Sequence, residues 1–239
     1  MKKILASLGY AAVNLFHPRM LWLMTWPMLV ALGVWGVLAA FLWTRTALRI
    51  AELIQRGLDM VHLSFADAAL VAGHVILFLL FVPLVYLTAL FILGVFGMVE
   101  IVDHVAATSF PGLERRRGGG MLGSGWNAVA ALIGMLVLAV VTLPLWLIPP
   151  LWPVVPIALF AWVNQRLLRY DALAEHADRE EMRRLFRERR GHLYLLGLLL
   201  ALLAYIPLLG FVAPVLFGLA FVRYLLGALA EHRATLSAP

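Results

Sequence analysis

Four long apolar segments that contain no Asp, Glu, Lys or Arg limit what this chain can fold into. They cover residues 21–44, 68–99, 126–165 and 193–222. Uncharged apolar segments longer than about 18 residues are typical of membrane-embedded helices. Only 13% of the 239 residues are charged, against about 25% in an ordinary soluble domain. We therefore predict an all-α integral membrane protein, whose first partner is the lipid bilayer.

The residue types that are missing exclude several classes of function. The chain has no cysteine, so it has no disulfide, thiol nucleophile or cysteine metal ligand. It contains no Gly-x-Ser-x-Gly, His-Glu-x-x-His or dinucleotide fingerprint, and we expect no enzymatic activity, no cofactor and no bound metal. The net charge of +6 comes from arginines next to apolar segments. This pattern is typical of membrane topology and does not indicate nucleic-acid binding.

The first two apolar segments predict full transmembrane helices, at 21–43 and 68–99. A helix over 21–43 rises ~34 Å, which exceeds a hydrocarbon core of ~30 Å. Between the two, residues 45–66 place apolar side chains on one face and charged side chains on the other, which predicts an amphipathic helix on the outer surface. The apolar spacing over 1–17 predicts a second amphipathic helix, which lies in the interface and ends before Pro18.

The other two apolar segments contain clustered prolines, in PLWLIPPLWPVVP at 144–156 and PLLGFVAP at 207–214. Proline breaks helices, because it lacks an N–H and clashes with the preceding turn. The arm before Pro144 is longer, but the other three helical arms beside the prolines rise ~20 Å or less, too little to cross ~30 Å. These arms are 157–168, 193–206 and 215–227. We predict two proline-tipped helical hairpins, 126–169 and 193–227, that partly penetrate the membrane; two full spans remain an alternative for the first of them.

The basic residues predict the orientation and the cytoplasmic parts. Every lysine and arginine except Arg45, Arg49 and Arg56 falls on one side of the predicted spans, and basic residues accumulate in the cytoplasm. We predict that both termini and a linker helix at 171–190 are cytoplasmic. Hairpins that stop midway leave backbone groups poorly covered, so we also expect a homo-oligomer packed through small residues. The candidates are Gly197, Gly218 and Gly227.

Three stretches carry a resemblance to a known family. They are HPRMLWLMTWPMLV at 17–30, RLLRYDALAEHADREEMRRLFRERRGHLYLLG at 166–197, and YIPLLGFVAPVLFGLAFVRYLLG at 205–227. In order and spacing the chain resembles the bacterial sulfate-permease CysZ family, which shares a domain with the eukaryotic etoposide-induced proteins (EI24). The resemblance implies one domain over 1–239, with two full spans and two partly penetrating hairpins. It also implies a bacterial inner-membrane location, frequent oligomers and a link to sulfate uptake.

The chain departs from that family at two motifs. Family sulfate permeases hold the anion in a Pro-Gly-Leu/Ile-Arg-Arg stretch, where this chain has PRMLW at 18–22. Their Pro-Phe-Asn-Gly stretch after the second span is also missing, and this chain has FGMV at 96–99 nearby. These differences predict weaker or altered anion selectivity, or a branch of the family with another role.

The start of the first span is one candidate anion-binding site. There, His17, Arg19 and Met20 combine the N–H groups of a helix start with a guanidinium, and both attract anions. The alternative is an interfacial proline turn with one arginine that extends to the water.

The loop ERRRGGGMLGSGWN at 114–127 is the other candidate. In it, Arg115, Arg116 and Arg117 precede three glycines, whose backbone amides are able to cradle an anion. The alternative is a flexible cytoplasmic turn whose arginines set the topology or touch anionic lipid.

Glu100, Asp103 and His104 share one helix face at the inner end of the second span. This spacing suits a metal site or a proton relay, and the alternative is a solvated helix end. Because the apolar segments carry no ion relay, the sequence predicts a passive conduit or permease for a small inorganic anion such as sulfate. The alternative function is membrane docking or assembly, with no transport.

Overall fold

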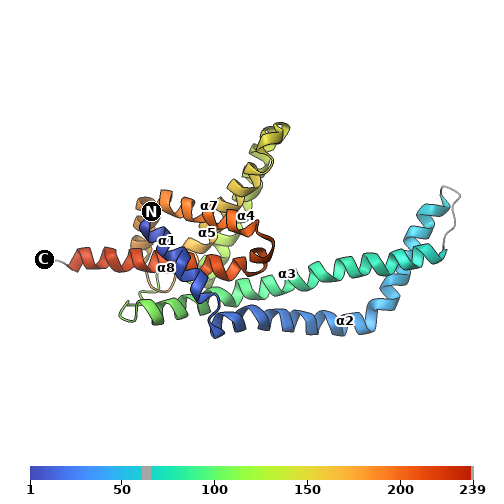
Figure 1. Cartoon of the computed structure of the whole chain (residues 1–239), viewed down its shortest axis with the longest axis horizontal. Helices are drawn as coiled ribbons and strands as arrows, with labels where there is room; N and C mark the ends of the chain where they lie inside the picture. The colour runs from blue at the N-terminus through green and yellow to red at the C-terminus, as the bar shows by residue number, and fades with distance from the viewer. Residues whose placement is uncertain (61–65, 238–239) are drawn as a thin grey trace. The chain divides into compact units, whose positions relative to one another are not determined.

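The structure is a computed structural model that describes residues 1–60 and 66–237, and within these residues every regular element is helical (Figure 1). The α-helices are α1 (Lys2–Asn14), α2 (Pro18–Asp59), α3 (Ala66–Ser109), α4 (Met121–Val141), α5 (Val154–Asp171), α6 (Arg179–Glu188), α7 (Arg190–Ala204) and α8 (Pro207–Ser237). Two 3₁₀ turns, η1 (Leu143–Leu147) and η2 (Pro149–Leu151), connect α4 to α5. The predicted all-α class is confirmed.

Five helical segments are long and apolar enough to cross a membrane, so the chain is a multi-pass membrane protein. They are Pro18–Asp59, Asp67–Ser109, Leu122–Val141, Pro149–Asp171 and Leu209–Leu236. The expected outer helix at 45–66 is not separate, because no Pro or Gly lies between Trp43 and Arg56 to end α2. Its residues 61–65 lie outside the described part of the chain.

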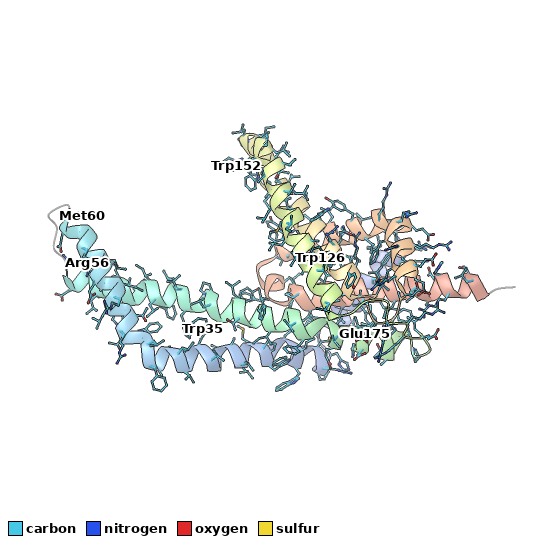
Figure 2. The ribbon with its side chains drawn as sticks, turned by 180° about the vertical axis from the view of Figure 1, so that it is seen from behind. Trp35, Arg56, Met60, Trp126, Trp152 and Glu175 are labelled. Carbon is cyan, nitrogen blue, oxygen red and sulfur yellow. The ribbon has the colours of Figure 1, made fainter. Side chains whose placement is uncertain are left out.

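The chain forms two compact units, residues 22–95 and residues 1–21 together with 96 onward. In the first unit the two long helices α2 and α3 run side by side (Figure 1). Ala31, Val85 and Ala89 form a small core, against which Trp35 packs. The indole N–H of Trp35, labelled in Figure 2, donates to Thr88 Oγ1 at 2.8 Å. Small core residues let the two helices approach closely.

Helix α8 is the centre of the second unit, where α1, α5 and α7 pack against it. In its apolar window, 67% of the residues are buried, whereas only 6% are buried in α4. Phe221 and Leu225 of α8 are fully buried. The exposed apolar surface of α4 therefore needs lipid or another apolar partner, but α8 does not.

The clustered prolines of 144–156 all lie where a helix tolerates them. Pro144 falls in the first turn of η1, and Pro149 and Pro150 open η2. Pro153 is the N-cap of α5, and Pro156 lies in its first turn, where the missing N–H has no intrahelical partner to lose. Trp152, labelled in Figure 2, lies at the far tip of this helical connection.

The arm after those prolines is longer than expected, and the arm before them is long, as predicted. Helix α5 begins at Val154 and has 18 residues, and α4 has 21. They rise ~27 and ~31 Å, whereas the prediction for the arm that is now α5 covers only 157–168. The difference arises because the sequence-based prediction treats every proline as a helix breaker, whereas a proline in the first turn does not shorten the helix.

The fourth apolar segment also differs from the prediction in detail. Its turn lies at Tyr205–Ile206, between α7 and α8, and the expected tip at 207–214 is helical with Pro214 inside it. Pro207 is the first residue of α8, a position that suits proline. Helix α8 then continues past the expected end at 227, because no breaker follows. In the predicted linker 171–190, Arg179–Glu188 forms α6, whereas residues 172–178 form turns.

The glycines expected at contacts between copies make close contacts within this chain. A Cβ on Gly197 would lie 2.7 Å from the carbonyl oxygen of Ala161 in α5. A Cβ on Gly218 would lie 2.7 Å from Ile101 Cδ1, and the Phe110 ring lies beside Gly227. These glycines set the separation of α8 and α7 from their neighbours.

We predict that Gly197→Ala destabilises the protein by about 1–3 kcal/mol, because the new methyl group collides with backbone that has no rotamer to adopt. Gly191→Ala, in the same helix, is the matched control: no atom lies within 4 Å of its Cβ, and it should stabilise by roughly 0.5 kcal/mol or leave stability unchanged. Thermal unfolding in detergent measures both. Equal midpoints for the two variants would contradict the close packing of α7 on α5.

Candidate functional site

The polar face at the C-terminal end of α3 contacts two other segments. The Glu100 carboxylate accepts a hydrogen bond from Arg19 Nε, and Asp103 Oδ1 accepts one from Arg115 Nη2 at 2.5 Å. Because Glu100 and Asp103 are three residues apart on a helix, both carboxylates face the same way. The two candidate anion sites thus each have an arginine tied to α3. Arg115 also lies 3.4 Å from a second carboxylate, that of Glu175.

The predicted helix-start site is already occupied by contacts within the chain. The N–H of Arg19 donates to His17 Nδ1 at 3.2 Å, and the N–H groups of Met20 and Leu21 donate to the His17 carbonyl. Pro18 has no N–H, so no amide of this first turn is free. The Met20 side chain is fully buried, and the exposed His17 ring lies 4.6 Å from that of His104.

His104 completes this face of α3. Its side chain is buried, and Nε2 lies 3.3 Å from Asn14 Oδ1 at the end of α1. Within the described residues no group of three or more His, Asp or Glu side chains is arranged to hold a metal ion. Glu100, Asp103 and His104 therefore share a face as predicted, and that face connects α1, α2 and the loop after α3.

The glycine-rich loop is paired with the turn after α5. The N–H groups of Arg117, Gly118 and Gly119 donate to the carbonyls of Glu175, Ala177 and Ala174, each at 2.9 Å. A Cβ on Gly118 would fall 2.5 Å from the Ala177 oxygen, so only glycine allows this approach. Arg117 adopts a left-handed φ of 47°. These amides, which sequence reasoning offered to an anion, are used by the backbone.

Two arginines share one buried carboxylate beside that loop. Glu181 is 6% exposed, and its two oxygens accept hydrogen bonds from Arg233 Nε at 2.8 Å and Arg233 Nη2 at 2.9 Å. Arg116 Nη1 adds a third at 3.0 Å. Arg233 also donates to the carbonyls of Glu114 and His176. The end of α8 is thereby tied to the loop after α3, the turn after α5, and α6.

Sequence reasoning missed Glu181 and Arg233, although one local signal was present. Asp178 and Glu181 form a capping box at the start of α6, a pattern that a sequence shows as Asp-x-x-Glu. The box fixes where Glu181 stands. Its partner Arg233 lies 52 residues away, and no local pattern connects the two.

The local environment changes the pKa of two groups in this cluster. The hydrogen bonds from Arg233 lower the pKa of Glu181 below its usual 4.5, because they favour the charged form. His176 is 1% exposed, and burial lowers its pKa below the usual 6.5, with a further lowering by Arg115. Each of these groups has a lower pKa in the folded than in the unfolded protein. As the pH falls through the unfolded-state pKa, the unfolded protein binds the proton first, so the free energy of unfolding decreases.

We predict that stability in detergent decreases as the pH falls below about 6.5, where unfolded His176 gains a proton that the folded protein resists. His176 lowers the free energy of unfolding by at most about 1.4 kcal/mol for each pH unit. Glu181 lowers it further below about pH 4.5. His176→Gln should flatten the decline between pH 6.5 and 5, and His74→Gln in the other unit should not. Thermal midpoints measured against pH distinguish them; identical slopes for all three proteins would contradict this assignment.

Comparison with known proteins gives one match. The family described as sulfate transporter CysZ/etoposide-induced protein 2.4 (EI24) has a model that matches residues 7–214. No curated protein and no solved structure matches the chain. The match begins within α1 and ends within α8, so it includes both candidate anion sites and the α3 face whose carboxylates contact them. This multi-pass helical chain therefore belongs to the sulfate transporter CysZ/etoposide-induced protein 2.4 family.

Proposed function

We propose that this protein is a passive membrane conduit for a small inorganic anion, with sulfate as the first candidate. The family match over residues 7–214 carries this proposal. The resemblance to bacterial permeases supports a location in the bacterial inner membrane, with cytoplasmic termini and a homo-oligomeric assembly.

The arginines nearest the proposed mouth of the conduit are held in exchangeable pairs. The side chains of Arg19 and Glu100 are 46% and 39% exposed, and those of Arg115 and Asp103 are 47% and 33% exposed. Exposed ion pairs contribute only about 0–1 kcal/mol. A doubly charged anion is therefore able to displace the carboxylate. Arg117 has no carboxylate partner among the described residues and is free to attract the anion.

The helix lengths support a specific topology. We infer that α4, at ~31 Å, and the segment Pro149–Asp171, whose 23 residues rise ~34 Å, cross the membrane with the tip at Pro150 outside. Helix α7 has 15 residues and rises ~22 Å, so we infer that it does not cross a ~30 Å core. We infer that α8, although long enough to cross, turns back with α7 as a hairpin and does not cross either, which keeps both termini on one side.

Single cysteines test this topology, because the chain has none of its own. We expect Pro150→Cys to react with a membrane-impermeant maleimide from outside intact cells. Glu180→Cys should react only after the membrane is opened, because α6 is proposed to be cytoplasmic. If Pro150→Cys stays unlabelled until the membrane is opened, α4 and α5 form a partly penetrating hairpin instead.

Flux of labelled sulfate into proteoliposomes, measured for the wild type and three variants, tests the proposed transport. Arg19→Ala should lower flux by about tenfold, the effect of losing one charge-assisted hydrogen bond to the anion. Glu100→Gln should lower the half-saturating sulfate concentration, because it removes the carboxylate that competes for Arg19. Arg184→Ala removes an arginine from an exposed pair with Glu188 and serves as the control with unchanged flux.

Two results would contradict this proposal in different ways. Flux no greater than that of empty liposomes, with chloride and sulfite equally inert, would favour the docking or assembly role. Flux that is unchanged in Arg19→Ala would keep transport but remove Arg19 from the path of the anion.

A further inference from the structure

A cleft between α1 and α8 gathers basic side chains that sequence patterns do not connect. It has a volume of about 310 Å³ and is lined by Lys3, Arg189 and Arg223, with Tyr224 and Glu231 beside them. A second hollow of about 300 Å³ shares Lys3, Arg189 and Tyr224. The first volume alone is far larger than the ~30 Å³ of one water molecule. The cleft can therefore hold a hydrated ion or a headgroup.

The charges in the cleft do not balance. Glu231 lies 2.7 Å from Lys3 Nζ and 3.8 Å from Arg189 Nη2. Arg223 has no carboxylate within ion-pair distance among the described residues. One acidic group therefore faces three basic ones, and the cleft attracts an anion.

Arg223 is held by aromatic rings in place of an acid. Its guanidinium carbon lies 4.7 Å from the centre of the Phe110 ring and 5.2 Å from that of Tyr10. Tyr10 is itself fixed, because its hydroxyl lies 2.8 Å from Thr108 Oγ1. Stacking uses the faces of a guanidinium and leaves the N–H groups at its edge for other acceptors. Arg223 is thus positioned, half-buried, with its donors unused by the described side chains.

The arrangement suits one class of ligand. Lys3 comes from α1, Arg189 from the junction of α6 and α7, and Arg223 from α8, so the cations converge from three segments. Guanidinium groups pair two N–H donors with two oxygens of phosphate or sulfate. We propose that this cleft binds a tetrahedral oxyanion, a phosphate or sulfate group that is either a free ion or part of a lipid headgroup. The inference does not rest on the proposed conduit, because none of these residues belongs to the Arg19 or Arg115 pairs.

A free ion and a lipid headgroup would present the same oxyanion to the cleft. Free phosphate or sulfate is present in the cytoplasm, where we place this end of the chain. A phospholipid is the other source, since Leu5 and Val13 of α1 and Phe16 in the turn after it are exposed and are able to contact acyl chains. The experiment therefore needs one arm for each source.

The first arm titrates inorganic sulfate and phosphate into the full-length protein in an uncharged detergent, by calorimetry. Arg223→Gln should weaken binding by about tenfold. Glu231→Gln should strengthen it, because a competing carboxylate is removed; a purely structural role for the cations would give no gain. Arg184→Gln is the charge-matched control with unchanged affinity. Increasing sodium chloride should weaken the wild-type affinity.

The second arm measures the thermal midpoint in nanodiscs of phosphatidylcholine alone and of phosphatidylcholine with phosphatidic acid. A thermal midpoint that rises with phosphatidic acid in the wild type but not in Arg223→Gln identifies the lipid as the source. Binding of the inorganic ions without such a rise identifies the free anion. The proposal is wrong if the wild type, Arg223→Gln and Glu231→Gln have the same affinity for the inorganic anions and the same response to phosphatidic acid. Failure of sulfate flux would leave this result unaffected, because binding is measured without transport.

Discussion

The second unit depends on one buried carboxylate, that of Glu181. A carboxylate that is 6% exposed is costly unless it is paired and hydrogen-bonded. Arg233 satisfies both of its oxygens, and Arg116 adds another donor. Because Arg233 also donates to Glu114 and His176, this pair draws together the end of α8, the loop after α3, the turn after α5, and α6. The position of the basic loop follows from that junction.

This junction separates the arginines into two groups. Arg116 and Arg233 are structural, since they neutralise Glu181. Arg19 and Arg115 are paired with exposed carboxylates of α3, and such pairs exchange partners at little cost. A sequence shows all of them as basic residues beside apolar helices, but the geometry assigns them different chemical roles.

Arg223 illustrates a third arrangement, in which aromatic rings hold a cation. The rings of Tyr10 and Phe110 position the guanidinium without neutralising its charge, so the cleft between α1 and α8 keeps a positive field. A carboxylate in their place would have closed the site. The cleft therefore presents unused donors, whereas the backbone N–H groups of Arg117, Gly118 and Gly119 in the glycine-rich loop already donate to backbone carbonyls.

The sequence by itself determined the membrane helices, because apolar length and the absence of charge are local properties. It also determined that Glu100, Asp103 and His104 share one face, which follows from helix periodicity alone. Only the tertiary structure decided which arginines are neutralised. Arg19 and Glu100 are 81 residues apart, and Arg233 and Glu181 are 52 apart. The lengths of the arms beside the prolines were also decided in three dimensions, because a proline in the first turn of a helix and a proline that breaks one look the same in sequence.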